Sequence, residues 1–203
     1  IQARVATSLE SSGPSGFSSG FSSDTSARSA LHPERTAIHR TGPSAPAKAL
    51  LASGQVRPGA TIRDFGCGYG ADAAYFAQHG LHAHRYDPYH YPHPPRGTFD
   101  WVFVNYVVNV LPYPAERVAA IHAAASYLAP GGIMVITARN PADLATSRSR
   151  HWRPYSDGFV TSQQTFQRAF TTPELEYLAA AAGLATNPWT SGVSKAAACF
   201  ALA

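Results

Sequence analysis

The sequence contains few cysteines, and this scarcity argues against one class of fold. Only two of the 203 residues are cysteine, Cys67 and Cys199, and they lie far apart in the chain. Small secreted domains that depend on disulfides carry many more. We therefore expect no disulfide framework and a reducing, cytoplasmic setting.

Long apolar runs and a strong excess of one charge are also missing. No apolar stretch approaches the roughly 20 residues that cross a membrane, and residues 1–30 lack the apolar core of a signal peptide. The formal net charge is only +4. This balance fits an anionic partner but does not by itself indicate nucleic acid. We expect no membrane partner.

The composition divides the chain into two parts. Residues 1–30 are rich in serine and glycine and hold too few apolar side chains to form a core. We interpret them as a flexible tail or linker. Residues 31–203 have the length and apolar content of one globular domain.

The stretch that organises this domain is residues 61–70, Thr-Ile-Arg-Asp-Phe-Gly-Cys-Gly-Tyr-Gly. A short apolar strand is followed by three alternating glycines, which permit positive φ and let a ligand approach the backbone. The residues from Ala71 favour a helix, whose N–H groups and dipole would face that ligand. A second strand ends at Asp87, about 20 residues later, where a carboxylate can hold ribose hydroxyls. The pattern predicts a nucleotide-binding turn.

The rest of the domain alternates strands and helices, as a parallel α/β sheet requires. Ser44, Pro46 and Gly54 have the positions of an N-cap, a first-turn proline and a stop signal. Further elements are expected as a strand at 99–105, a helix at 114–129, a strand ending at 139, a helix at 172–182 and a hairpin at 185–189 and 196–202. Residues 139–171 are expected to be irregular.

The segment after Asp87 is too short for the helix and strand that usually follow in such sheets. Only residues 88–98 separate Asp87 from the next strand, and prolines interrupt them. We therefore expect the sheet to lack one edge strand and its helix. Pro88, Tyr89 or Tyr91 would then supply stacking for a base.

The Asp-x-Gly-x-Gly-x-Gly pattern that begins at Asp64 resembles motif I of the class I S-adenosylmethionine (SAM) methyltransferases. The resemblance implies a Rossmann-like α/β sheet with helices on both faces, an antiparallel hairpin at one edge, and SAM as cofactor. It places the first acid near the amino and ribose end of SAM and the second on the ribose diol. The cofactor-binding residues implied are Asp64, Phe65, Gly66, Cys67, Gly68, Asp87, Pro88 and Asn105.

Residues 35–184 are similar to a narrower group, the methyltransferases associated with bacterial DNA phosphorothioation gene clusters. The matching pieces are Arg-Thr-Ala-Ile-x-Arg, Asp-Pro-Tyr, Asn-Tyr-Val-Val-Asn-Val and Asp-Gly-x-x-Thr…Thr-Phe-Gln-Arg. This likeness implies a bacterial protein and leaves the acceptor of the methyl group open.

Three side chains are candidates for the catalytic position. Asn105, Tyr106 and Asn109 follow the strand at 99–105, near the sheet edge where open α/β sheets bind ligands. In-line methyl transfer needs alignment and exclusion of water, and a base is optional. An equal alternative is that the three residues only stabilise the corner after the strand.

The substrate is expected to meet arginines. Arg40 precedes the first helix of the domain, and Arg139, Arg150 and Arg153 belong to the arginine-rich stretch 139–171. These could hold an anionic small molecule or a nucleic acid, or they could form a solvated surface. Four histidines at 82–93 lack the spacing of a metal site, so no metal is expected.

Two other functions remain open at this point. The chain could bind SAM for carboxypropyl transfer or cyclisation, or it could bind SAM without catalysis.

Overall fold

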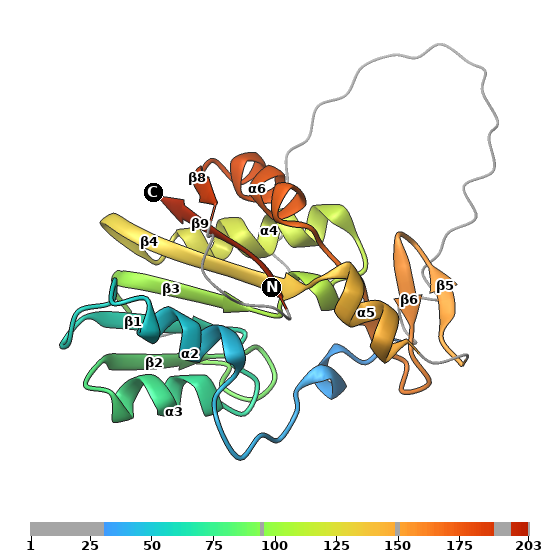
Figure 1. Ribbon diagram of the computed structural model, residues 1–203, viewed down its shortest axis with the longest axis horizontal. Coiled ribbons are helices and arrows are strands. Elements are labelled where there is room, and N and C mark those ends of the chain that lie inside the picture. Colours follow the sequence, from blue (N-terminus) through green and yellow to red (C-terminus); the bar gives the residue numbers. More distant parts are fainter. Residues whose placement is uncertain (1–30, 94–95, 149–150, 189–195, 203) are drawn as a thin grey trace, which may run out of the picture. The chain divides into compact units, whose positions relative to one another are not determined.

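A mostly parallel six-stranded sheet forms the centre of the described part of the chain, residues 31–93, 96–148, 151–188 and 196–202, in a computed structural model (Figure 1). Its strand order is β2-β1-β3-β4-β9-β8. The strands are β1 Thr61–Phe65, β2 His82–Tyr86, β3 Phe99–Asn105, β4 Leu128–Arg139, β8 Ala185–Pro188 and β9 Ala196–Leu202.

Helices lie on both faces of this sheet (Figure 1). One face packs against α2 and α3, and the other packs against α4 and α6, so each face has its own apolar core. The helices and short 3-10 turns are η1 Pro33–Thr36, α2 Ala45–Ala52, α3 Ala71–Gln78, η2 Val108–Val110, α4 Pro114–Ala125, α5 Pro141–Ser147 and α6 Thr172–Ala181.

The strand β3 shows how the sequence sustains two cores. Val102 and Val104 belong to the core under α4 and α6, while Trp101 and Phe103 belong to the core under α2 and α3. Alternate side chains of a strand point to opposite faces. A strand covered on both faces is therefore apolar at nearly every position, as predicted for 99–105. Each such buried side chain contributes roughly 1.5–3 kcal/mol to folding.

The expected sheet topology is confirmed. Among the described residues, β2 pairs only with β1, so it is the edge strand and no further strand follows it. At the other edge β8 and β9 form the expected antiparallel hairpin. The helix expected from the Ser44 cap is α2, and the Ser44 hydroxyl accepts a hydrogen bond from Ala47 N at 3.1 Å.

The expectation that residues 139–171 are irregular was wrong. Helix α5 begins there, because Asn140 caps it by accepting a hydrogen bond from Asp143 N and Pro141 occupies its first position. A separate three-stranded antiparallel sheet follows, with the order β5-β6-β7. Its strands are β5 Arg153–Tyr155, β6 Gly158–Val160 and β7 Phe166–Gln167. They are too short to show the alternation by which strands are recognised in a sequence.

Ion pairs connect this small sheet to helices α4 and α6. Arg117 of α4 is 2% exposed and donates from both terminal nitrogens to Asp157, at 2.6 Å each. Arg168 also contacts Asp157 at 2.9 Å and reaches Glu174 of α6 at 2.7 Å. A bidentate arginine–carboxylate pair fixes both position and orientation. Hydrogen bonding to Arg117 lowers the pKa of Asp157.

We predict that Asp157→Asn lowers the free energy of unfolding at pH 7 by about 2 kcal/mol. The change leaves the buried Arg117 charge without its partner, and the partial exposure of Asp157 keeps the loss below the 3–5 kcal/mol of fully buried pairs. Urea denaturation measures it. Glu176→Gln on α6 is the control, because Glu176 makes no ion pair with a described residue.

The pH dependence gives a second readout of the same pair. A carboxylate with a lowered folded-state pKa stabilises the fold above its unfolded pKa, and this stabilisation disappears as the pH falls through the folded value. The free energies of unfolding of wild type and Asp157→Asn should therefore show their full difference at pH 6–7, and the difference should disappear in acid. A difference that persists unchanged at pH 2–3 would contradict the assignment.

Candidate functional site

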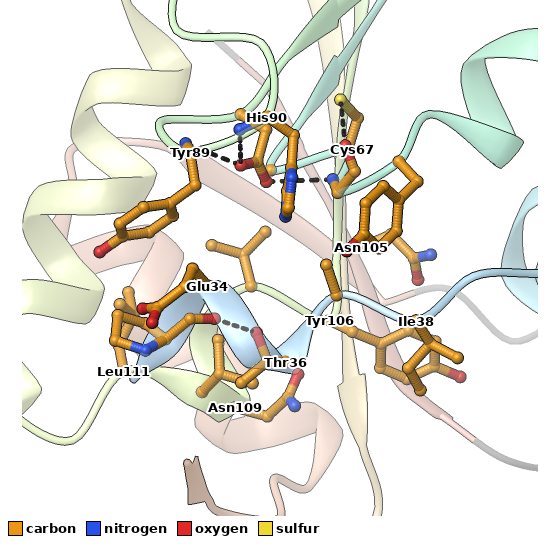
Figure 2. Close-up of a pocket in the computed structure, with 18 of the residues that line it drawn as sticks. Glu34, Thr36, Ile38, Cys67, Tyr89, His90, Asn105, Tyr106, Asn109 and Leu111 are labelled. Atoms are coloured by element: carbon orange, nitrogen blue, oxygen red, sulfur yellow. Dashed lines mark hydrogen bonds between the residues drawn. The ribbon is translucent and has the colours of Figure 1, made fainter. Parts of the chain in front are cut away.

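The carboxyl ends of β1, β2 and β3 meet at a cavity of about 400 Å³. Ligands of open α/β sheets bind at this edge, and small-molecule sites typically measure roughly 300–1,000 Å³. The segment 33–40, hereafter the strap, lies along the same cavity (Figure 2). Residues of η2, β4, α5 and β7 also line it. The cavity thus has the size of one nucleotide-like ligand.

The glycine turn supplies one wall at backbone level. Gly66 and Gly68 have φ values of +76° and +53°, and both line the cavity. A Cβ added to Gly66 would collide with the side chain of Val107, and one added to Gly68 would lie 3.1 Å from Cβ of Ala37 on the strap. Only glycine leaves this wall open, as the sequence predicted.

Asp87 is held at the end of β2 by backbone donors. Its Oδ2 accepts from Gly68 N at 3.0 Å, and its Oδ1 accepts from Tyr89 N at 2.9 Å and His90 N at 3.0 Å. The residue is 8% exposed and lines the cavity. Because a carboxylate has about four lone-pair sites, it keeps capacity for ligand hydroxyls. Its orientation is fixed before any ligand arrives.

The short loop after Asp87 takes the place of the missing edge strand. Pro88, Tyr89 and His90 line the cavity, while Tyr91 pairs back to Asp87 and stacks on Arg85 instead. Of the three residues proposed for base stacking, the structure brings Pro88 and Tyr89 to the cavity wall. His90, which the sequence did not single out for this wall, joins them.

Asp64 and Phe65 lie behind the wall. Asp64 accepts from Ala73 N at the start of α3, at 3.1 Å, and Phe65 packs in the core. Burial, and then the neighbouring Asp72, raise the pKa of Asp64 well above its usual range. Neither side chain is part of the cavity wall. A direct contact of either with a cofactor stays a prediction.

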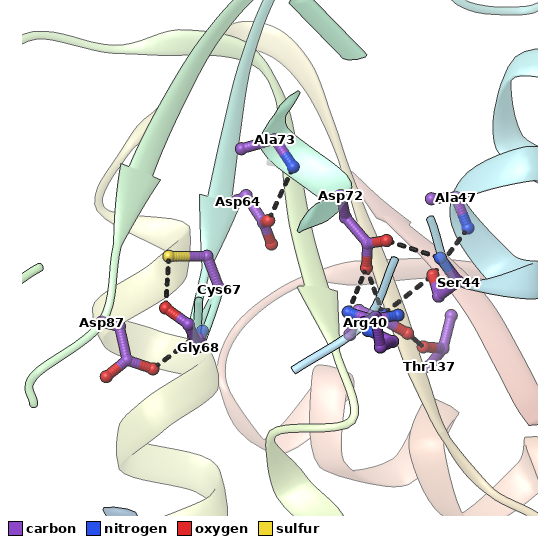
Figure 3. Close-up of polar contacts among 11 residues, drawn as sticks. Arg40, Ser44, Ala47, Asp64, Cys67, Gly68, Asp72, Ala73, Asp87 and Thr137 are labelled. Carbon is purple, nitrogen blue, oxygen red and sulfur yellow. Dashed lines mark hydrogen bonds and ion pairs between the residues drawn. The ribbon is translucent and has the colours of Figure 1, made fainter. Parts of the chain in front are cut away.

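Asp72, in the first turn of α3, is the centre of a buried hydrogen-bond network (Figure 3). It is 1% exposed and accepts from Ser44 N at 2.6 Å, from Asn105 Nδ2 at 2.8 Å and from Arg40 Nη2 at 3.1 Å. The network joins the strap, α2, α3 and β3. Sequence reasoning missed Asp72, since an acid in the first turn of a helix is ordinary.

Asn105 lines the cavity, but its amide is occupied by this network. Its Nδ2 also donates to Ser44 Oγ at 3.1 Å, and its Oδ1 accepts from Thr137 Oγ1 at 2.6 Å. Both amide hydrogens are therefore used within the protein. These contacts favour a positioning role for Asn105 over the catalytic role considered from the sequence.

Tyr106 follows in a strained conformation. Its φ of 58° is in the left-handed region, which non-glycine residues rarely adopt. Such strain concentrates at ligand sites. Its ring lines the cavity, and burial raises the pKa of its phenol, so the hydroxyl is neutral at physiological pH.

The strap is attached to the glycine turn by ring stacking. His39 stacks on Tyr69 with a centroid distance of 3.5 Å, and Tyr69 contacts the ring of His90 at 4.4 Å. At the other end His32 N donates to Gln164 O at 2.8 Å. The strap thus closes one side of the cavity with Glu34, Thr36, Ala37 and Ile38.

Arg139 lines the far end of the cavity, and its guanidinium group is already paired within the protein. Arg139 contacts Asp143 at 2.9 Å, Ser147 at 2.6 Å and Gln167 at 3.4 Å. Asp143, Gln167 and Asn109 share this wall, and the first two were missed because they lie on α5 and β7. Arg153 lies on β5 outside the wall, and Arg150 lies outside the described residues.

No group of three or more histidine, cysteine, aspartate or glutamate side chains suited to a metal occurs among the described residues. Within the same residues, no helix has the length and apolarity to span a membrane. Cys67 is a free, buried thiol in the cavity wall, and burial raises its pKa far above its usual range. The thiol is therefore not a reactive nucleophile.

The fold and the site are those of an α/β protein with a cavity of nucleotide size at the carboxyl ends of its strands. A family model described as a methyltransferase domain matches residues 37–187, well over half of the chain. The chain therefore belongs to the methyltransferase family. Its sequence has no match among curated proteins.

Solved structures with a similar fold include methyltransferases. One is the 1,6-didemethyltoxoflavin-N1-methyltransferase of Burkholderia thailandensis, with S-adenosylhomocysteine bound, at 21% identity and a TM-score of 0.58, covering 78% of this chain and 76% of that one. Another is an S-adenosylmethionine-dependent methyltransferase of Mesorhizobium loti, at 13% identity and a TM-score of 0.50, covering 77% and 98%.

We predict that Asp87→Ala weakens binding of S-adenosylhomocysteine at least tenfold in a folded protein. The change removes a prearranged charged acceptor, and a hydrogen bond to a charged group contributes roughly 1.5–3 kcal/mol. Isothermal titration calorimetry measures the affinity. Asp100→Ala is the matched control, because Asp100 also accepts a backbone N–H, from Thr61, but lies outside the cavity wall. Equal affinity of wild type and Asp87→Ala would refute the role.

We also predict that Gly68→Ala weakens this binding more than a strain-matched change elsewhere. The new methyl group would press on Ala37 and narrow the space between turn and strap. Gly59→Ala is the control, since Gly59 has φ +80° and open space around its Cβ position. Both variants should lose similar stability, about 1 kcal/mol for the left-handed backbone, and only Gly68→Ala should lose affinity. Equal affinity of the two variants would contradict this.

Proposed function

We propose that this protein transfers the methyl group of SAM to a small-molecule acceptor, in the cavity beneath the strap. The single observation that carries the proposal is the joint wall of Gly66, Gly68 and Asp87. An open glycine backbone and a fixed carboxylate, 19 residues apart, face one cavity of nucleotide size. These residues fit the adenosyl part of SAM.

The rest of the cavity wall has two parts, one on each side of Asp87. Pro88, Tyr89 and Leu111 give an apolar end that suits the adenine base. On the other side of the cavity lie Tyr106 and Ile38, which suit the methionine end (Figure 2). In this arrangement Asp87 receives the ribose hydroxyls, and Cys67 contributes its backbone and a neutral side chain to the wall.

When bound, SAM supplies an activated methyl group on a sulfonium ion, so the protein need not generate a reactive group itself. The chain has three tasks. The glycine turn and Asp87 orient the adenosyl part, and the strap excludes water. Tyr106 and Asn109 shape the space where the acceptor lies. Alignment of this kind accounts for much of the rate of two-substrate reactions.

A small acceptor fits this cavity better than a nucleic acid. A volume of about 400 Å³ leaves little space beyond the cofactor, and the wall carries three carboxylates, Glu34, Asp87 and Asp143, against two guanidinium groups. Nucleic-acid sites instead present unpaired basic side chains to phosphates. Association with DNA phosphorothioation remains a hypothesis carried only by the sequence likeness.

The experiment is a binding and product assay. Calorimetry should show S-adenosylhomocysteine binding in the micromolar range, and wild type incubated with SAM and a cell extract should form S-adenosylhomocysteine. Formation of methylthioadenosine would instead identify carboxypropyl transfer or cyclisation. Binding without any turnover would identify a non-catalytic SAM-binding module. Absence of binding would refute the proposal.

A further inference from the structure

Two residues of the cavity wall carry a buried polar atom without a hydrogen-bond partner among the described residues, His90 at Nε2 and Asn109 at Oδ1, and the Asn109 atom is the one at the end where the acceptor would lie. Asn109 is 2% exposed and lies on η2, in the cavity wall. Figure 2 shows it on the side of the cavity opposite His90. A buried acceptor without a partner costs roughly 1–3 kcal/mol, so native proteins seldom keep one without a use.

The orientation of the Asn109 amide follows from its neighbours. Arg139 has only donors, so the Gln167 atom that it contacts at 3.4 Å must be Oε1. The same Oε1 lies 3.4 Å from the Asn109 amide, which must therefore present Nδ2 to it. Oδ1 is then left as the unsatisfied atom. The contacts with Gln167 hold it in that position.

The cations at this end are already paired. Arg139 contacts Asp143, Ser147 and Gln167, and Arg40 contacts the buried Asp72. The charges of these arginines are therefore largely balanced by Asp143 and Asp72, and an anionic acceptor would gain little net attraction from them. An acceptor that donates a hydrogen bond would instead satisfy Asn109 Oδ1, after a movement of the side chains that cover this buried atom. The polar groups therefore favour a neutral donor over a carboxylate or phosphate.

Building on the proposed methyl transfer, we propose that Asn109 Oδ1 orients the attacking atom and that the acceptor is a neutral amine. An amine nitrogen donates its N–H to Oδ1 and still has a lone pair for attack. A hydroxyl or thiol would first have to lose its proton, and Asp143, the carboxylate that shares this end of the wall with Asn109, is paired with Arg139. The acceptor class is thus an uncharged N–H compound, such as an aryl or heteroaryl amine.

The transfer balances without a base in the protein. The acceptor nitrogen forms a bond to the methyl carbon, and the carbon–sulfur bond breaks with its electron pair moving to sulfur. The positive charge passes to the methylated nitrogen, which then releases its proton to solvent. Asn109 contributes orientation alone, because an amide oxygen does not take up this proton.

The test uses sinefungin, a SAM analogue in which a carbon carrying an amine replaces the sulfonium and its methyl group. If Oδ1 faces the methyl position, this amine donates to it. Calorimetry should show that wild type binds sinefungin more tightly than S-adenosylhomocysteine. Asn109→Leu should lose on the order of tenfold in sinefungin affinity, and its affinity for S-adenosylhomocysteine should change less than about threefold.

Asn109→Asp is the second variant and keeps the test decisive if the leucine variant does not fold. Its carboxylate should favour the charged amine, so the preference for sinefungin over S-adenosylhomocysteine should increase. Gln78→Glu, on the exposed end of α3, is the charge-matched control and should leave the preference unchanged. An unchanged preference in the folded Asn109 variants would overturn the role of Oδ1 while the proposed function stands. Failure of wild type to bind S-adenosylhomocysteine would overturn both.

A separate titration tests the class of the acceptor. With S-adenosylhomocysteine saturating, aniline and benzoate are titrated as minimal amine and carboxylate probes. We expect aniline to bind the complex and benzoate to bind at least tenfold more weakly. Benzoate binding as well as aniline, or neither probe binding, would overturn the amine assignment.

Discussion

The buried carboxylate of Asp72 is the interaction on which the geometry of the site depends. Removing a charge from water costs several kcal/mol even after relaxation. Here the cost is offset by a backbone N–H from Ser44, an amide from Asn105 and the guanidinium of Arg40. Because these donors belong to three different segments, the charge can be satisfied only when α2, β3 and the strap are in place together.

Asp64 shows the effect of this requirement. Its carboxyl group lies next to Asp72, is fully buried, and has a pKa raised well above the usual range by burial and by that neighbour. Two adjacent buried carboxylates cannot both ionise cheaply. Asp72 has the cationic partner, Arg40, while burial and Asp72 hold Asp64 toward its neutral form at the start of α3. The acids of the motif region thus have different electrostatic roles.

The sequence predicted the part of the fold that follows local rules. The glycine turn, the Ser44 cap, the apolar strand 99–105 and the missing edge strand all rest on residue types whose effect is local. The small sheet β5-β6-β7 was not predictable, because its strands of two or three residues are stabilised by the distant ion pair of Arg117 with Asp157. The same limit applies to Asp72, whose importance comes from partners 28 to 33 residues away.

The substrate end of the site shows most clearly why counting charges in a sequence misleads. The arginines of residues 139–171 suggested a grip on an anion, yet in the fold Arg139 is paired with Asp143 and Arg168 with Asp157 and Glu174. Arginines paired with carboxylates shape the cavity more than they attract an anionic ligand, because the field of each arginine is largely cancelled by its partner at short range. Within the described part of the chain, the buried side-chain atom left without a partner at this end is an amide oxygen, on Asn109. What a cavity selects depends on the groups that the protein leaves without a partner, and these become visible only when all other contacts have been assigned.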